Sequence, residues 1–141
     1  MLLADYLASA AARDFAYGQF DCAILMADWL MACGWPDAMP DRRGTYSTER
    51  AFRAAVRSEG GLVASCRRRF ARIGLREASQ PRHGDVALAL VPFARRRGRW
   101  LRRPTGALVL DGGGLVVMAQ SPRGVVAARL PLLVSWSASH A

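Results

Sequence analysis

The residues with the clearest chemical potential are Asp21 and Cys22, which follow a glycine-bearing loop and precede a long apolar run. The run from Ala23 to Cys33 predicts a helix, so Cys22 should lie in its first turn. Free backbone N–H groups at a helix start favour negative charge. A cysteine placed there can have its pKa lowered until the thiolate acts as a nucleophile. The alternative is that Cys22 is a small buried hydrophobe, as free cysteines commonly are.

The helix that should position Cys22 has recognisable ends. Asp21 can serve as its N-cap, and Gly34 is placed to end it in a left-handed conformation. The helix is apolar nearly all round, which is typical of a central buried helix. Asp28 interrupts this surface, and a carboxylate there requires an arginine partner.

The remaining segments predict helices first and strands second. Helical spacing and caps predict further helices over residues 2–13, 48–58 and 62–70, with Ser47 as the cap of the second. After Arg72, apolar runs between turn residues predict strands at 86–91, 106–111, 115–119, 125–130 and 132–136. We therefore expect one α+β domain over residues 1–141, with N-terminal helices packed on one face of a C-terminal antiparallel sheet.

Composition points to a folded, electropositive protein. Hydrophobic residues make up 52% of the chain and charged residues 22%, which is typical of a globular domain. The net charge is +9 and every basic side chain is arginine, so the surface should suit acidic partners. Two arginine-rich stretches, the turn at 42–46 and a predicted loop at 92–104, supply the candidate binding residues Arg43, Tyr46, Arg95, Arg96, Arg97 and Arg99.

Cysteine and histidine spacing predicts neither disulfides nor a metal centre. Cys22, Cys33 and Cys66 form an odd, widely spaced set, which indicates free thiols. His83 and His140 do not complete a zinc site with them, and we expect no metal and no cofactor. No apolar run reaches membrane-spanning length. The first residues lack the basic region of a secretory signal, so we expect synthesis and folding in a bacterial cytoplasm.

Three motifs in order suggest a family. They are Gly18-Gln19-Phe20-Asp21-Cys22, Gly84-Asp85-Val86-Ala87-Leu88 and Gly106-Ala107-Leu108-Val109-Leu110-Asp111. Together they resemble the papain-like cysteine peptidases of the compact NlpC type, which are cell-wall endopeptidases. The resemblance implies a papain-like fold with Cys22 at the nucleophile position. The stretch Arg43-Gly44-Thr45-Tyr46 is similar to a loop of the phage- and prophage-encoded relatives, which are associated with tail-tip assembly.

The resemblance breaks down at the catalytic base. The position that the family gives to its histidine falls on Thr105, and threonine cannot hold a thiolate–imidazolium pair. His83 is the remaining candidate base, but it precedes the Gly-Asp turn, at the opposite end of a strand. His140 lies near the end of the chain, where ordering is poor.

Three functions follow from these residues. The first is a structural or assembly protein of a phage or phage-like tail tip, incorporated in the particle, with other tail-tip proteins as partners and peptidase chemistry lost. The second is an active cysteine endopeptidase or amidase that cleaves peptidoglycan peptides with Cys22 as nucleophile and His83 as base. The third is a nucleic-acid-binding module, which we do not expect, because no such fold signature appears and only Trp100 is interleaved with the arginines.

Overall fold

The order of elements along the chain is α+β, as the sequence predicts. In the computed structural model, which describes residues 1–120, 122 and 124–140, four helices precede five strands. They are α1 (Leu3–Ala11), α2 (Cys22–Ala32), α3 (Glu49–Ser58), α4 (Leu62–Ile73), β1 (Val86–Arg96), β2 (Arg99–Val109), β3 (Leu115–Gln120), β4 (Gly124–Arg129) and β5 (Leu132–Trp136). The turn predicted between β3 and β4 includes Ser121 and Arg123, which lie outside the described residues.

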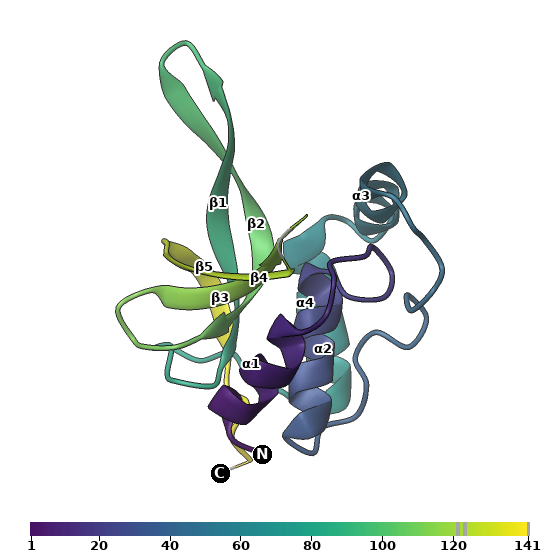
Figure 1. Cartoon of the computed structure of the whole chain (residues 1–141), viewed down its shortest axis with the longest axis vertical. Coiled ribbons are helices and arrows are strands. Elements are labelled where there is room, and N and C mark those ends of the chain that lie inside the picture. The colour runs from purple at the N-terminus through teal and green to yellow at the C-terminus, as the bar shows by residue number, and fades with distance from the viewer. Residues whose placement is uncertain (121, 123, 141) are drawn as a thin grey trace.

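The strands form one antiparallel sheet in the order β4-β3-β2-β1-β5. Figure 1 shows the helices gathered on one side of this sheet, with the β3–β4 hairpin running across the direction of β1 and β2. None of the described helices is long and apolar enough to cross a membrane.

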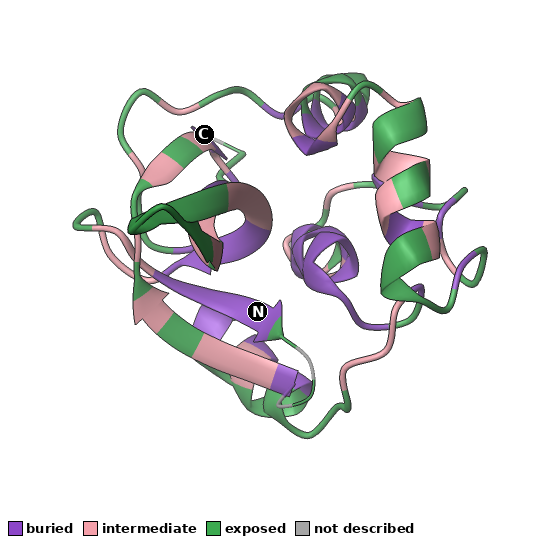
Figure 2. Ribbon diagram, turned by 90° about the horizontal axis from the view of Figure 1, so that it is seen from above, coloured by how far each residue is buried: buried purple, intermediate pink, exposed green. Residues whose placement is uncertain are grey.

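Helix α2 is the centre of the fold, and this confirms the predicted buried helix. Eight of its eleven residues are buried, and Figure 2 shows a buried helix in the middle, between the sheet and the other helices. The Nε1–H of Trp29 donates to the carbonyl of Gly84 at 2.7 Å, which fixes α2 against the turn before β1. The pairing predicted for Asp28 is present as well, since Arg13 and Arg43 approach its carboxylate at 2.9 and 2.7 Å.

On its other side the sheet carries a second, smaller apolar cluster, whose buried members lie on β1, β2 and β3. Alternate residues of β1 and β2, such as Ala87 and Val109, face this cluster, while Val86 and Leu108 face the helices. Both faces of the central strands are therefore buried, which explains why their sequences read as continuous apolar runs.

The prediction of a loop over residues 92–104 is wrong, because these residues form the outer half of the β1–β2 hairpin. The strands pair as far as Arg96 and Arg99, with a register shift between Pro92 and Ala94. Arg97 and Gly98 both have positive φ angles, 52° and 76°, as a two-residue hairpin turn requires. The prolines are tolerated because the hairpin extends beyond its neighbouring strands. β5 pairs with β1 only as far as Ala89, and β3 pairs with β2 only at Leu108 and Val109, so no third strand needs the missing N–H groups of Pro92 and Pro104.

The start of α3 differs from the prediction by one residue. Thr48, and not Ser47, is the N-cap, because the Thr48 side chain accepts a hydrogen bond from the Ala51 N–H at 3.1 Å. An ionic cluster with two buried arginines anchors the loop before α3 to α4: Arg42 and Arg69 both bind Glu59, and Arg69 also binds Asp41 at 2.6 Å.

Candidate functional site

Asp21 holds the start of α2, and so Cys22, in a fixed position. Its carboxylate accepts hydrogen bonds from the N–H groups of Ala23 and Ile24, both at 3.0 Å, and of Gly18 at 2.8 Å. The hydroxyl of Tyr46 donates to the same carboxylate at 3.2 Å. Asp21 therefore acts as the predicted N-cap, and it also joins two loops that the sequence analysis treated as separate motifs.

Gly18 lets these two loops approach closely. Its φ angle is +83°, and a Cβ atom at this position would lie 2.1 Å from the carbonyl oxygen of Tyr46. The N–H of Gly44 in turn donates to the carbonyl of Gly18 at 2.8 Å. A glycine is thus required here by both conformation and space.

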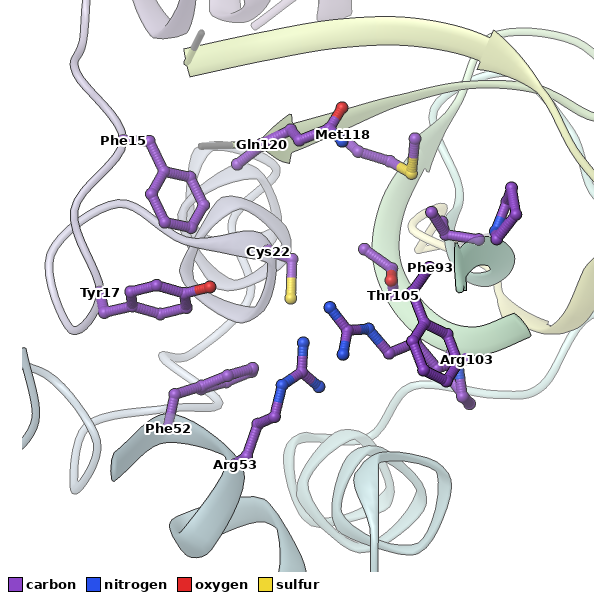
Figure 3. Close-up of a pocket in the computed structure, with 14 residues that line it drawn as sticks. Phe15, Tyr17, Cys22, Phe52, Arg53, Phe93, Arg103, Thr105, Met118 and Gln120 are labelled. Carbon is purple, nitrogen blue, oxygen red and sulfur yellow. The ribbon is translucent and has the colours of Figure 1, made fainter. Parts of the chain in front are cut away.

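Cys22 lines a cavity of about 330 Å³ between α2, α3 and the base of the β1–β2 hairpin. Figure 3 shows the Cys22 sulfur directed into this space, with Thr105 across from it. Aromatic rings of Phe15, Tyr17, Phe52 and Phe93 form much of the wall. Thr105, which the resemblance aligns with the family's histidine, therefore lies in the same cavity as Cys22.

The environment of Cys22 does not favour a thiolate. The residue is only 9% exposed. Burial, reinforced by the negative charge of Asp21, raises the pKa of the Cys22 thiol to about 11, although a hydrogen bond from the Gly106 backbone acts in the opposite direction. Of the two interpretations of Cys22, the buried thiol is the one that fits the structure, because burial raises the pKa and the charge of Asp21 adds to this effect. At neutral pH the thiol is protonated.

The structure does not bring His83 to Cys22. Nδ1 of His83 lies 2.9 Å from the carbonyl oxygen of Leu110, just beyond the end of β2. Leu110 is four residues from Gly106, which packs against Cys22, and four extended residues span about 13 Å. Nε2 of His140 lies 2.8 Å from the carbonyl oxygen of Cys33, at the other end of α2. Neither histidine is among the described residues that line the cavity.

Two arginines that the sequence analysis did not select are directed into the cavity. They are Arg53 of α3 and Arg103 of β2, whose guanidinium groups point toward the Cys22 sulfur in Figure 3. Both share one carboxylate: Glu49 accepts from Arg53 Nε at 2.9 Å and from Arg103 Nη2 at 3.3 Å. Arg103 and Thr105 are two residues apart on one strand and so share a face. The sequence did not reveal this shared face, because residues 92–104, which include Arg103, were predicted to form a loop and not a strand.

The predicted binding residues separate into two groups. Arg43 and Tyr46 already have partners within the chain, since Arg43 pairs with Asp37 and Asp28 and Tyr46 binds Asp21. The other four lie near the tip of the hairpin and are exposed, well away from Cys22: Arg95, Arg96, Arg97 and Arg99. No group of three or more acidic, histidine or cysteine side chains suited to a metal occurs in the part of the chain that the structure describes.

Comparison with known proteins assigns a family. A family model described as a domain of unknown function, DUF6950, matches residues 1–135. The chain belongs to the DUF6950 family. No curated protein and no solved structure matches it. The features of this DUF6950 protein that bear on its function are therefore its cavity and its surface.

Proposed function

We propose that this DUF6950 protein is a structural or assembly protein of a phage or phage-like tail tip, built on a degenerate papain-like, NlpC-type peptidase fold. The observation that carries the proposal is the pair Cys22 and Thr105 in one cavity. The nucleophile position is kept, whereas the position of the base holds a residue that cannot accept a proton from a thiol.

The state of Cys22 supports the loss of catalysis. A thiol with a pKa of about 11 is almost entirely protonated at neutral pH, and nucleophilic attack requires the thiolate. An active peptidase would need a base within hydrogen-bond reach of the sulfur. His83 is held at Leu110, just beyond the end of β2, so the alternative of an active endopeptidase lacks its second residue.

The outer half of the β1–β2 hairpin, residues 92–104, supports a role in assembly. We call this segment the hairpin arm. Its exposed side chains include Phe93, Trp100 and Leu101. Six arginines accompany them and no acidic residue lies between positions 86 and 110. Aromatic and arginine side chains are the types enriched in protein interfaces. We expect the hairpin arm to contact an acidic surface of a neighbouring tail-tip protein.

Two experiments test this function. First, purified protein is incubated with peptidoglycan and the released peptides are quantified; we expect no release above that of a Cys22→Ala variant. Cys22-dependent release would overturn the loss of catalysis and would favour the endopeptidase.

The second experiment is mass spectrometry of gradient-purified particles from the host strain. We expect the chain in the particles, and we expect its loss when Arg95, Arg96, Arg97 and Arg99 are all changed to Gln. A matched variant removes the same charge from four exposed arginines outside the arm, Arg50, Arg72, Arg76 and Arg82, and should be retained. Absence of the wild-type chain from particles would contradict the proposal.

A further inference from the structure

The cavity at Cys22 has an uncompensated positive charge. Among the described residues that line it, Arg53 and Arg103 are the charged ones. They share the single carboxylate of Glu49, which approaches from outside the cavity lining. The Cys22 thiol is neutral at pH 7 and contributes no negative charge. Two guanidinium groups against one carboxylate leave an excess of one positive charge in this ion-paired group. The nearby Asp21 carboxylate does not line the cavity and is bound by three backbone N–H groups and the Tyr46 hydroxyl.

The rest of the wall is apolar or carries neutral hydrogen-bonding groups. Phe15, Phe52 and Phe93 surround the space, with Val91 and two prolines beside them. The hydroxyl of Tyr17 points toward Cys22 in Figure 3, and burial raises its pKa, so it stays a donor at neutral pH. Concave sites with apolar walls and a few convergent polar groups are typical of small-ligand sites, and a volume of about 330 Å³ lies within their usual range.

We propose that this cavity binds an organic carboxylate attached to an apolar group, with Arg53 and Arg103 as the residues that hold the carboxylate. One carboxylate balances the excess charge, whereas a phosphate dianion would leave an excess of negative charge. Guanidinium groups bind carboxylates through paired, charge-assisted hydrogen bonds, and the aromatic walls accommodate the apolar group. The C-terminal residue of a peptide and a free small acid both have this chemistry. The inference goes beyond the assembly role and does not depend on it.

The test uses N-acetylphenylalanine as the probe, with isothermal titration calorimetry and NMR shifts of backbone amides. The neutral control is N-acetylphenylalanine amide. We expect saturable binding of the acid, with the largest shifts near Cys22, and binding at least about tenfold weaker for the amide. A tetrapeptide ending in phenylalanine, compared with its amide, decides whether the site also accepts a peptide C-terminus. Equal binding of acid and amide, no binding of the acid, or tighter binding of phenyl phosphate would overturn the proposal.

Single substitutions test whether the acid binds at Arg53 and Arg103. Arg53→Gln and Arg103→Gln should each weaken binding of the acid by about tenfold. Arg50→Gln on α3 and Arg99→Gln on β2 remove the same charge outside the cavity and should change binding less than about twofold. Equal losses in all four variants would contradict a site at Arg53 and Arg103.

Glu49→Gln provides a test that loss of folding cannot imitate. It releases both arginines from their shared carboxylate, so we expect tighter binding of N-acetylphenylalanine. Unchanged or weaker binding in a folded Glu49→Gln protein would contradict the proposal.

Discussion

Gly106 of β2 lies directly against the backbone of Cys22. A Cβ atom on Gly106 would come within 2.5 Å of the Cys22 carbonyl oxygen and 2.6 Å of the Met26 Cε. This contact brings the start of α2 onto the sheet and places Thr105, the residue before Gly106 on β2, beside the cavity. The geometry of the candidate site therefore depends on Gly106, because a side chain at this position would collide with the start of α2.

We expect Gly106→Ala to destabilise the protein by about 1–3 kcal/mol, because the added methyl group meets backbone that is held by the Asp21 cap. Chemical denaturation measures this difference. The control is Gly113→Ala, where the new Cβ meets chiefly the flexible end of Arg129, and its cost should stay below about 1 kcal/mol. Equal stability of wild type and Gly106→Ala would show that the helix and strand are not in tight contact.

Asp21→Ala should cost about 2–4 kcal/mol of stability. The variant removes the cap of α2 and leaves the Gly18 N–H and the Tyr46 hydroxyl without a buried acceptor. Thr48→Ala removes the more exposed cap of α3, with one hydrogen bond, and should cost only about 1 kcal/mol. Thermal unfolding of both variants and of wild type measures the two losses of stability. A smaller loss for Asp21→Ala than for Thr48→Ala would contradict the structural role given to Asp21.

The ionic cluster around Glu59 predicts a loss of stability in acid. Burial acts to raise the pKa of Glu59, but hydrogen bonds from Arg42 and Arg69 outweigh it, and the pKa is lowered overall. A hydrogen bond from Arg69 likewise lowers the pKa of Asp41 to about 2. A carboxyl group with a lowered folded-state pKa stabilises the protein above its unfolded-state pKa, and this contribution is lost as the pH falls through the folded-state value.

Glu59→Gln should therefore be less stable than wild type by about 1–3 kcal/mol at pH 7, a range reduced for the partial exposure of Glu59. The difference should shrink as the pH falls below about 4.5, the ordinary pKa of the group. Urea denaturation of both proteins at pH 7, 5, 4 and 3 measures this difference in stability. A difference that is constant with pH would mean that the Glu59 charge contributes nothing.

Restoring a base is the most specific test of the proposed descent from a peptidase. Thr105→His places an imidazole in the cavity beside Cys22, where it can stabilise the thiolate. We expect alkylation of Cys22 at pH 7.5 to accelerate at least about tenfold, since each unit of pKa lowering gives tenfold more thiolate. Thr105→Asn, which adds a polar group of similar reach without a base, should show no such gain. If a folded Thr105→His protein were alkylated no faster than wild type, Thr105 would not occupy the position of the family's base.

The sequence predicted the features that depend on residues close together in the chain. Helix α2 was predicted well because its apolar surface, the Asp21 cap and Gly34 all lie within one short stretch. The hairpin arm was missed because six arginines and two prolines resemble a loop, and only the Arg97-Gly98 turn indicated otherwise. The convergence of Arg53 and Arg103 could not be predicted at all, since 50 residues separate them and their meeting depends on how α3 packs beside β2.

The most direct test of the central claim, that Cys22 is a protonated thiol without a base, is the pH dependence of its alkylation. The background is Cys33→Ser with Cys66→Ala, because Cys66 is fully buried and a serine hydroxyl there would need a partner. We predict a rate that is low at neutral pH and keeps rising toward pH 11, the pKa expected for this thiol. A rate that reaches its plateau below pH 7 would demonstrate a stabilised thiolate and would contradict the account.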